Sequence, residues 1–156
     1  MPITTDAAIA ELLTGARTIA MVGASDRPDR PSHGVMAFLQ GHGYRVIPVN
    51  PAISGQQLLG EHVRDSLGQL GVPIDIVDIF RRSDAVGPIV DEAVRVGAKA
   101  IWMQLGVVDP EAAARAEAAG LQVVMDRCPK IEIGRLGIAK PGRATLPSGD
   151  AAPPAP

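Results

Sequence analysis

The apolar residues of the chain fall into two kinds of segment. Five short runs are almost continuously apolar, which is typical of parallel strands buried on both faces. These runs occupy residues 18–25, 45–51, 74–80, 98–106 and 121–126. Four other segments repeat apolar residues three and four positions apart, which predicts amphipathic helices at 4–13, 33–43, 83–97 and 110–120. A looser stretch, 56–70, predicts one short helix that ends near Gly71.

Local signals support these boundaries. Thr4 or Thr5 can cap the first helix, and Pro110 and Gly120 suit the start and the end of the last one. Strands that alternate with helices in this way form βαβ units. We therefore predict an α/β fold, a Rossmann-like doubly wound parallel sheet of about five strands in the order 3-2-1-4-5, with helices on both faces. Ligands of such sheets bind beyond the carboxyl ends of the strands, at the switch point beside the first strand.

Length and composition narrow the function classes. The 156 residues predict one Rossmann-like domain over 1–138 and a disordered tail rich in Pro, Ala and Gly over 139–156. Fifteen Lys and Arg against 17 Asp and Glu, and only four aromatic residues, argue against a nucleic-acid partner. No apolar run approaches the roughly 20 residues of a membrane helix, so no membrane partner is expected either. The single cysteine excludes an internal disulfide and fits a cytoplasmic location.

The first strand ends in Gly23, Ala24 and Ser25, a sequence that permits a tight turn against a phosphate. The loop that follows carries Arg27 and Arg30, which suit an anionic ligand. The full G-x-G-x-x-G fingerprint is absent, so a plain strand-to-helix turn with two solvated arginines is the alternative.

The second strand ends in Asn50 and Pro51. No Asp or Glu lies between Asp29 and Glu61, although an NAD site usually has an acidic residue here for the ribose hydroxyls. This argues against NAD and is compatible with a ligand that carries a phosphate on its adenosine ribose. Alternatively, Asn50 is only a turn residue ahead of a proline.

The remaining strand ends carry further candidate residues. Phe80 can lie against an adenine ring or belong to the core, and Arg81 with Arg82 would need an anionic partner if buried. Ser83 is expected to cap the next helix. Gln104 would face either a cleft or a buried polar partner, since the strand around it is apolar. Cys128, after the fifth strand, is either a small core residue or a reactive thiol beside Arg127 and Lys130.

Signals for catalysis are few. The three histidines, His33, His42 and His62, lack metal-ligand spacing, so no metal site is expected. Neither a G-x-S-x-G elbow nor a P-loop is present. Asp75 and Asp78 share the third strand at odd spacing, so they face opposite sides of the sheet and are expected to be structural or to flank the strand ends. We therefore predict no catalytic residue.

Five segments together resemble the small stand-alone CoA-binding proteins of bacteria. The segments are IAMVGASDRPDRPSHGV, GYRVIPVNP, DIVDIFRRS, GAKAIWMQLGV and VVMDRCPKIE. These proteins are similar to the N-terminal CoA-binding domain of the succinyl-CoA synthetase α subunit. The resemblance covers about residues 5–135 in order.

The resemblance implies a role for each strand end. Residues 23–25 would meet the CoA phosphates, with Arg27 or Arg30 nearby, and 50–51 would contact the nucleotide. Residues 80–82 would line the adenosine side and Met103 with Gln104 the CoA arm. Cys128 and Pro129 match an Asn-Cys-Pro turn of the synthetase domain. The synthetase's phosphohistidine belongs to a following domain, which this chain lacks, so ligase chemistry is not expected of this polypeptide alone.

Three functions follow as hypotheses. The first is a non-catalytic carrier or sensor that binds CoA or an acyl-CoA thioester. The second is a detached CoA-binding subunit of an acyl-CoA ligase or acyltransferase, assembled with a separate chain. The third is an NADP-binding domain for redox sensing. The partners expected are the CoA thioester, and either a second copy of the chain or a separate ligase subunit.

Overall fold

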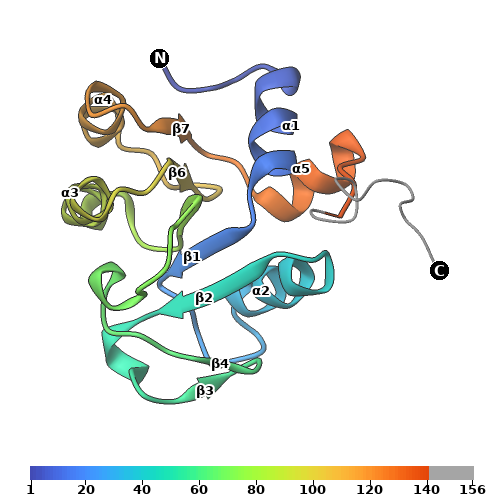
Figure 1. The fold of residues 1–156 in the computed structure, drawn as a ribbon, viewed down its shortest axis with the longest axis vertical. Helices are drawn as coiled ribbons and strands as arrows, with labels where there is room; N and C mark the ends of the chain where they lie inside the picture. The colour runs from blue at the N-terminus through green and yellow to red at the C-terminus, as the bar shows by residue number, and fades with distance from the viewer. Residues whose placement is uncertain (141–156) are drawn as a thin grey trace.

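The computed structural model describes residues 1–140, which form a five-stranded parallel sheet between two layers of helices (Figure 1). The sheet order is β2-β1-β5-β6-β7, and every neighbouring pair is parallel. Its strands are β1 (Thr18–Val22), β2 (Arg45–Val49), β5 (Ile76–Ile79), β6 (Ala100–Met103) and β7 (Gln122–Val124). The predicted fold class, a doubly wound α/β sheet, is therefore confirmed.

Side chains alternate between the two faces of the sheet, and each face has its own apolar layer. On one face Val77 and Ile101 pack with residues of α3 (Val86–Val96) and α4 (Pro110–Ala118). On the other, Met21 and Trp102 pack with residues of α1 (Asp6–Gly15), α2 (Pro31–Gly41) and α5 (Pro129–Leu136). Figure 1 shows α3 and α4 on one side of the strands and α1, α2 and α5 on the other.

The predicted strand order, 3-2-1-4-5, is wrong. Numbered along the chain, the five sheet strands lie in the order 2-1-3-4-5, so β2 is at the edge and β5 pairs with β1. Pro48 in β2 gives the physical reason, because proline has no N–H for a second neighbouring strand and is therefore confined to edge strands. The outer edge of β2 is instead covered by Arg64, whose N–H donates to the Pro48 carbonyl oxygen at 3.0 Å. The topological switch point consequently lies between β1 and β5.

The segment between β2 and β5 is largely non-helical. It contains an antiparallel hairpin, β3 (Gln57–Leu58) and β4 (Glu61–His62), between the short 3₁₀ turns η1 (Pro51–Ile53) and η2 (Leu67–Gln69). The hairpin turn has positive φ at Leu59 and Gly60, 49° and 84°. The two turn residues are Leu-Gly, whereas such turns usually contain Asn-Gly or Asp-Gly. Leucine rarely adopts a positive φ, so the sequence gives no signal for this turn. The one short helix predicted near Gly71 corresponds to η2.

Other predicted elements recur with shifted ends. Thr5 caps α1 by accepting the Ala8 N–H at 3.3 Å. Ser83 does not cap α3, because it begins the 3₁₀ turn η3 (Ser83–Ala85) that precedes that helix. Helix α5 was not predicted, although Pro129 at its first position is a usual start signal.

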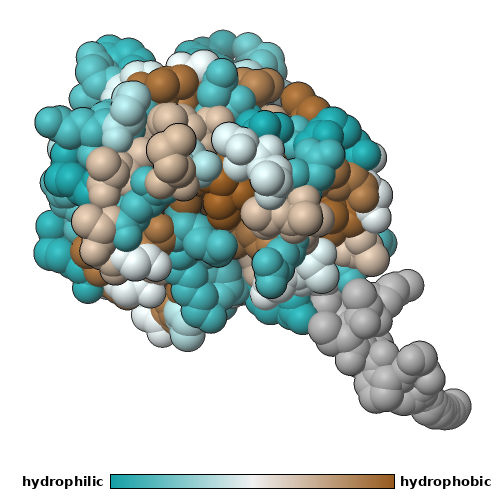
Figure 2. All heavy atoms as spheres, turned by 90° about the horizontal axis from the view of Figure 1, so that it is seen from above, coloured by the Kyte–Doolittle hydropathy of each residue, from teal (hydrophilic) through white to brown (hydrophobic). Residues whose placement is uncertain are grey.

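The surface of the protein carries both hydrophilic and apolar residues (Figure 2). On the face drawn in Figure 2, hydrophilic and apolar residues lie side by side. None of the helices within residues 1–140 is long and apolar enough to cross a membrane. Most of the predicted tail, residues 141–156, lies outside the described part of the chain.

Candidate functional site

The sheet order brings the predicted site residues into one row. The loops after β2, β1, β5, β6 and β7 begin with Asn50, Gly23, Phe80, Gln104 and Met125 in turn. Adjacent strands lie about 4.8 Å apart, so these five ends span roughly 19 Å along the carboxyl edge. The strand ends that carry the site are thus neighbours in space, as the parallel-sheet rule requires.

Gly23 forms a turn for which no other residue fits. Its φ is 87°, and a Cβ added here would collide with the carbonyl oxygen of Phe80. The Gly23 N–H donates to the Val49 carbonyl oxygen at 2.9 Å, and the Phe80 N–H donates to the Val22 carbonyl oxygen at 2.8 Å. The turn after β1 is therefore fixed against both neighbouring strands.

Further hydrogen bonds hold the loop that follows. Asn50 donates through Nδ2 to the Ala24 carbonyl oxygen at 2.8 Å, and its Oδ1 accepts the Ala52 N–H at 2.9 Å. The Ser25 N–H donates to Oγ of the buried Ser32 at 3.1 Å. The N–H groups of Gly23 and Ser25 are thus already used within the protein. Of the three backbone donors predicted for phosphate, only the Ala24 N–H has no acceptor within residues 1–140.

A small hollow opens where α2 begins. It has a volume of about 120 Å³ and is lined by Gly23, Ser25, Arg30, Pro31, Ser32 and Phe80. No side chain accepts a hydrogen bond from the first N–H groups of α2. The positive end of the helix dipole is therefore open toward the hollow, which suits an anion.

The arginines near this hollow differ in their partners. Arg27 pairs with Asp29 at 3.4 Å, and both side chains are exposed, so the positive charge of Arg27 is partly balanced within the loop. Arg30 lines the hollow and has no ion-pair partner within residues 1–140. Of the two candidates named for the phosphate side, Arg30 is therefore the better placed.

Arg81 and Arg82 are both exposed, so burial does not require an anionic partner for either of them. Arg82 is paired with Asp84 at 3.1 Å. Arg81 has no acidic partner within the described residues, and its side chain lies against the Gly23 turn. The geometry thus leaves Arg81 available beside the hollow.

The end of β6 carries a buried polar pair. Gln104 is 6% exposed and Asp78, in the middle of β5, is fully buried. With its amide nitrogen toward Asp78, Gln104 donates to both carboxyl oxygens at 2.9 and 3.2 Å. Burial raises the pKa of Asp78 well above its ordinary value. Gln104 thus has the buried polar partner that the sequence allowed for, while Met103 points into the opposite apolar layer, away from Gln104.

Cys128 lies in the apolar layer beside α5. Only 5% of it is exposed, and it precedes Pro129, the first residue of that helix. Its burial favours the interpretation as a core residue over the reactive thiol. The neighbouring Arg127 is held by an ion pair with Glu132 at 3.2 Å.

The loop after β6 is pinned at two points. The Val108 N–H donates to the Ser83 hydroxyl oxygen at 2.9 Å, and the Gly106 N–H donates to Asp126 Oδ1 at 2.7 Å. The side chains of Leu105, next to the first point, and of Val108, at the second, are 57% and 41% exposed. The carboxyl edge therefore has a fixed apolar rim next to Gln104.

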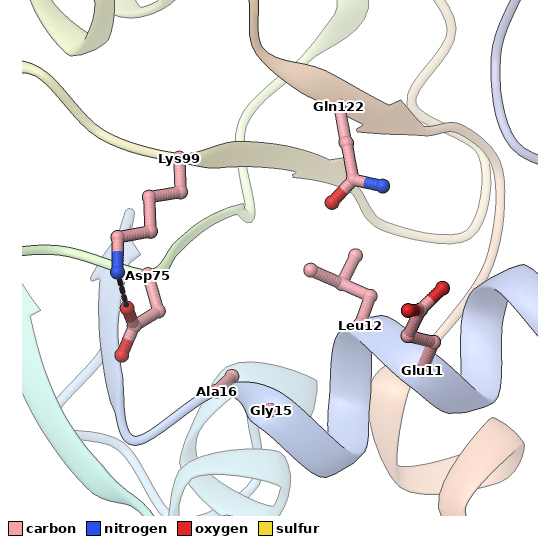
Figure 3. A pocket seen from close by; sticks show the side chains of 7 residues that line it. All are labelled: Glu11, Leu12, Gly15, Ala16, Asp75, Lys99 and Gln122. Atoms are coloured by element: carbon pink, nitrogen blue, oxygen red, sulfur yellow. Dashed lines mark ion pairs between the residues drawn. The ribbon is translucent and has the colours of Figure 1, made fainter.

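A second hollow, of about 260 Å³, lies at the opposite end of the sheet (Figure 3). Asp75 and Lys99, which line it, form an ion pair of 3.3 Å. Burial alone would raise the pKa of Asp75, but the N–H groups of Thr18 and Arg17 together with Lys99 hold it below its ordinary value. Its carboxylate is therefore already satisfied. Ligands of parallel sheets bind at the carboxyl ends, so the smaller hollow is the better candidate.

Within residues 1–140, no three His, Cys, Asp or Glu side chains come together as a metal site. The candidate site is an open edge with one small hollow, two arginines that have no ion-pair partner within residues 1–140, a buried amide–acid pair and an apolar rim.

Comparison with known proteins identifies the family of the chain. Residues 17–134 match the family described as "CoA binding domain". The uncharacterized protein YneT of Bacillus subtilis (strain 168) is 42% identical over 125 residues, which cover 80% of this chain and 91% of YneT.

Solved structures are similar as well. A hypothetical protein from Pyrococcus horikoshii OT3 has a TM-score of 0.82 at 38% identity, over 87% of this chain and 96% of that one. A protein from Thermus thermophilus has a TM-score of 0.82 at 39% identity, over 85% and 99%. A dinucleotide-forming acetyl-coenzyme A synthetase of Ca. Korarchaeum cryptofilum shares the fold, with a TM-score of 0.62 at 24% identity, over 72% of this chain and 26% of that one. On the match over residues 17–134 and the identity to YneT, the chain belongs to the CoA-binding domain family.

Proposed function

We propose that the protein binds CoA or an acyl-CoA at the carboxyl edge of its sheet and acts as a non-catalytic carrier or sensor. The observation that carries this proposal is the hollow at the start of α2, where an uncapped helix end meets Arg30 and the Gly23 turn. The positive end of the helix dipole attracts a phosphate group. Membership of the CoA-binding family supports CoA as the source of that phosphate.

The size of the hollow determines how such a ligand would lie. At about 120 Å³ it is smaller than the roughly 300–1,000 Å³ of a typical small-molecule pocket. It therefore suits a phosphate part of the ligand, while the rest would extend along the row of strand ends. Arg81, which has no acidic partner within residues 1–140, would meet the remaining negative charge.

Asn50 supports CoA over NAD. An acidic residue at the end of β2 would bind the ribose hydroxyls of NAD, but would repel the ribose phosphate of CoA. Asn50 is uncharged, and both ends of its amide are engaged by the backbone of Ala24 and Ala52. NADP, which also has a ribose phosphate, is the ligand to be separated from CoA by experiment.

Calorimetric titration of the purified chain with CoA, acetyl-CoA, NAD and NADP tests the ligand. We expect binding of CoA or acetyl-CoA and none of NAD. Binding of NADP without CoA would overturn the proposal. The non-catalytic part is tested by following free thiol from acetyl-CoA, where release above the spontaneous rate would contradict it.

A second candidate function is a CoA-binding subunit for a separately encoded acyl-CoA ligase chain. The apolar rim of Leu105 and Val108 favours it, since exposed apolar residues at the edge of a site suit a covering partner. Its test mixes the chain with an ATP-dependent ligase subunit that lacks its own CoA domain. Acyl-CoA formation that requires both chains would support this candidate, and formation by the ligase subunit alone would contradict it.

A further inference from the structure

The second hollow, at the amino ends of the strands, lies where the end of α1 meets the sheet (Figure 3). The sheet contributes the residues at the starts of β5, β6 and β7, which are Asp75, Lys99 and Gln122. The second half of α1 and its C-cap contribute Glu11, Leu12, Gly15 and Ala16. At about 260 Å³ the hollow is smaller than the roughly 300–1,000 Å³ of a typical small-molecule pocket. It therefore suits a ligand smaller than a nucleotide.

Two of the charged side chains in the second hollow neutralise each other. Lys99 and Asp75 form the ion pair of 3.3 Å, and Asp75 also accepts two backbone N–H groups. Glu11 has neither an ion-pair partner nor a hydrogen-bond donor within residues 1–140. Figure 3 shows the Lys99–Asp75 pair on one side of the hollow and Glu11 on the other, with Leu12 between them. The charge that is not balanced in the hollow is therefore the negative charge of Glu11.

The end of α1 adds a second acceptor. The last four carbonyl groups of a helix have no partners within the helix. Those of residues 12–14 accept hydrogen bonds from the Ala16 N–H, the Tyr44 hydroxyl and the Arg17 guanidinium, respectively. The Gly15 carbonyl oxygen has no donor in the part of the chain that the structure describes. It lies at the negative end of the helix dipole, where a cation is favoured.

Gln122 adds a third polar group. Its side chain makes no hydrogen bond within residues 1–140, and Figure 3 shows its amide directed across the hollow toward α1. The amide oxygen is an acceptor. Leu12, partly buried against the apolar layer, lies between these groups and forms an apolar floor. A ligand in the second hollow would thus meet acceptors from Glu11, Gly15 and Gln122 around an apolar surface.

We propose that the second hollow binds the guanidinium group of a small compound with a short aliphatic stem. A guanidinium is a planar cation with five N–H donors and no acceptor, and its fork matches the two oxygens of a carboxylate. Glu11 would accept two parallel hydrogen bonds from this fork, and the oxygens of Gly15 and Gln122 would accept the other donors. The stem would lie on Leu12. The site is at the opposite end of the sheet from the proposed CoA site, so the two proposals are tested independently.

A small compound fits the second hollow better than the arginine side chain of a protein partner. Protein interfaces are built around a central cluster of buried apolar residues. The large apolar side chains that are exposed within residues 1–140 all lie outside the lining of the second hollow. The surroundings of the hollow therefore lack the apolar area that a protein partner would cover.

NMR titration with n-butylguanidine tests the site, because shifts of the backbone amides report where a weakly bound ligand lies. We expect these shifts at residues 11–16, Lys99 and Gln122. n-Butylurea has the same planar shape without the charge, so it should bind at least about tenfold more weakly. n-Butylamine should also bind more weakly than n-butylguanidine, because an ammonium lacks the planar fork.

Three variants assign the contacts. Glu11→Gln should weaken the binding of n-butylguanidine at least about tenfold, because a charge-assisted contact is lost. Gln122→Ala should weaken it about threefold to tenfold, the value of one hydrogen bond. Glu111→Gln is the matched control, since this glutamate lies on the exposed surface of α4, and it should bind as the wild type does. Glu11 and Gln122 are both exposed, so thermal unfolding should show all three variants folded.

Several results would overturn the proposal. Equal affinity for n-butylguanidine and n-butylurea would mean that the charge is not recognised, and equal affinity for n-butylamine would mean that the planar fork is not. Wild-type affinity in Glu11→Gln, or an equal loss in Glu111→Gln, would remove Glu11 as the partner. Amide shifts that are absent, or confined to residues outside the second hollow, would show that the ligand does not bind there.

Discussion

Asn50 donates a hydrogen bond of 2.8 Å to the carbonyl oxygen of Ala24, which ties the end of β2 to the turn that follows β1. The same amide accepts the Ala52 N–H at the start of η1. One side chain therefore fixes two loops on the edge strand side of the candidate site. Because the Asn50 side chain is uncharged, this position also lacks the acidic residue that would bind the ribose hydroxyls of NAD.

Two replacements of Asn50 separate these roles. Asn50→Ala removes both hydrogen bonds and should lower the free energy of unfolding by about 1–2 kcal/mol. Asn50→Asp keeps an acceptor for the Ala52 N–H and adds a negative charge, so it should weaken CoA binding at least about tenfold with a smaller loss of stability. Urea unfolding and calorimetry measure the two effects. Equal CoA affinity for Asn50→Asp and wild type would show that the ribose phosphate lies elsewhere.

Arg81 and Arg82 provide a matched pair. Arg82 is held by Asp84, whereas Arg81, beside the Gly23 turn, has no acidic partner in the part of the chain that the structure describes. Arg81→Ala should weaken CoA binding about tenfold, because a charge-assisted contact to a phosphate is lost. Arg82→Ala should change the affinity less than about twofold. Titration at two salt concentrations checks the result, and equal losses in both variants would contradict the assignment.

The fold class followed from the sequence because buried parallel strands leave long apolar runs that are visible without tertiary information. The strand order could not be predicted in the same way, because an apolar run does not show which strand lies at the edge of the sheet. Pro48 carried that information, because a strand that lacks one N–H is suited to an edge. The hairpin turn at Leu59 and Gly60 left no usual signal, as leucine was forced into a conformation that glycine or asparagine normally takes.

The location of the candidate site was predictable for a topological reason: all strand ends of a parallel sheet point to one edge. Which side chains are free there was not. The Arg82–Asp84 ion pair and the Asp78–Gln104 pair depend on how loops and strands meet in space. Asp78 was expected to be structural because odd spacing only assigns it to a face, and its neighbours on β1 and β6 become known only with the register.

Gly23 should tolerate no side chain. Gly23→Ala would force a Cβ against the Phe80 carbonyl oxygen at a φ of 87°, so we expect a loss of stability of about 2 kcal/mol or more. Gly34 in α2 is the control, since nothing lies within 4 Å of a Cβ added there. Gly34→Ala should raise stability by up to about 1 kcal/mol through helix propensity. Similar thermal midpoints for the two variants would show that the Gly23 turn can rearrange.

The buried acid Asp78 predicts an unusual dependence of stability on pH. Its pKa in the folded chain is raised well above 3.8, chiefly by burial, while in the unfolded chain it stays near that value. The folded state therefore retains a proton that the unfolded state releases, and the stabilising contribution is complete below about pH 3.8. It is lost progressively as the pH rises from there through the folded pKa. Asp78→Asn cannot ionise, so its stability relative to wild type should increase over this range.

Measuring that difference isolates Asp78 from the other acids. Asp75, whose pKa is lowered, and the paired Glu132 are present in both chains, so their contributions cancel when Asp78→Asn is compared with wild type at each pH. Urea unfolding at a series of pH values from 4 to 8 gives the required free energies. A stability difference that rises with pH means that Asp78 is neutral in the folded chain and ionised in the unfolded chain. A difference that stays constant over the whole series means that Asp78 ionises alike in both states, which would contradict the raised pKa.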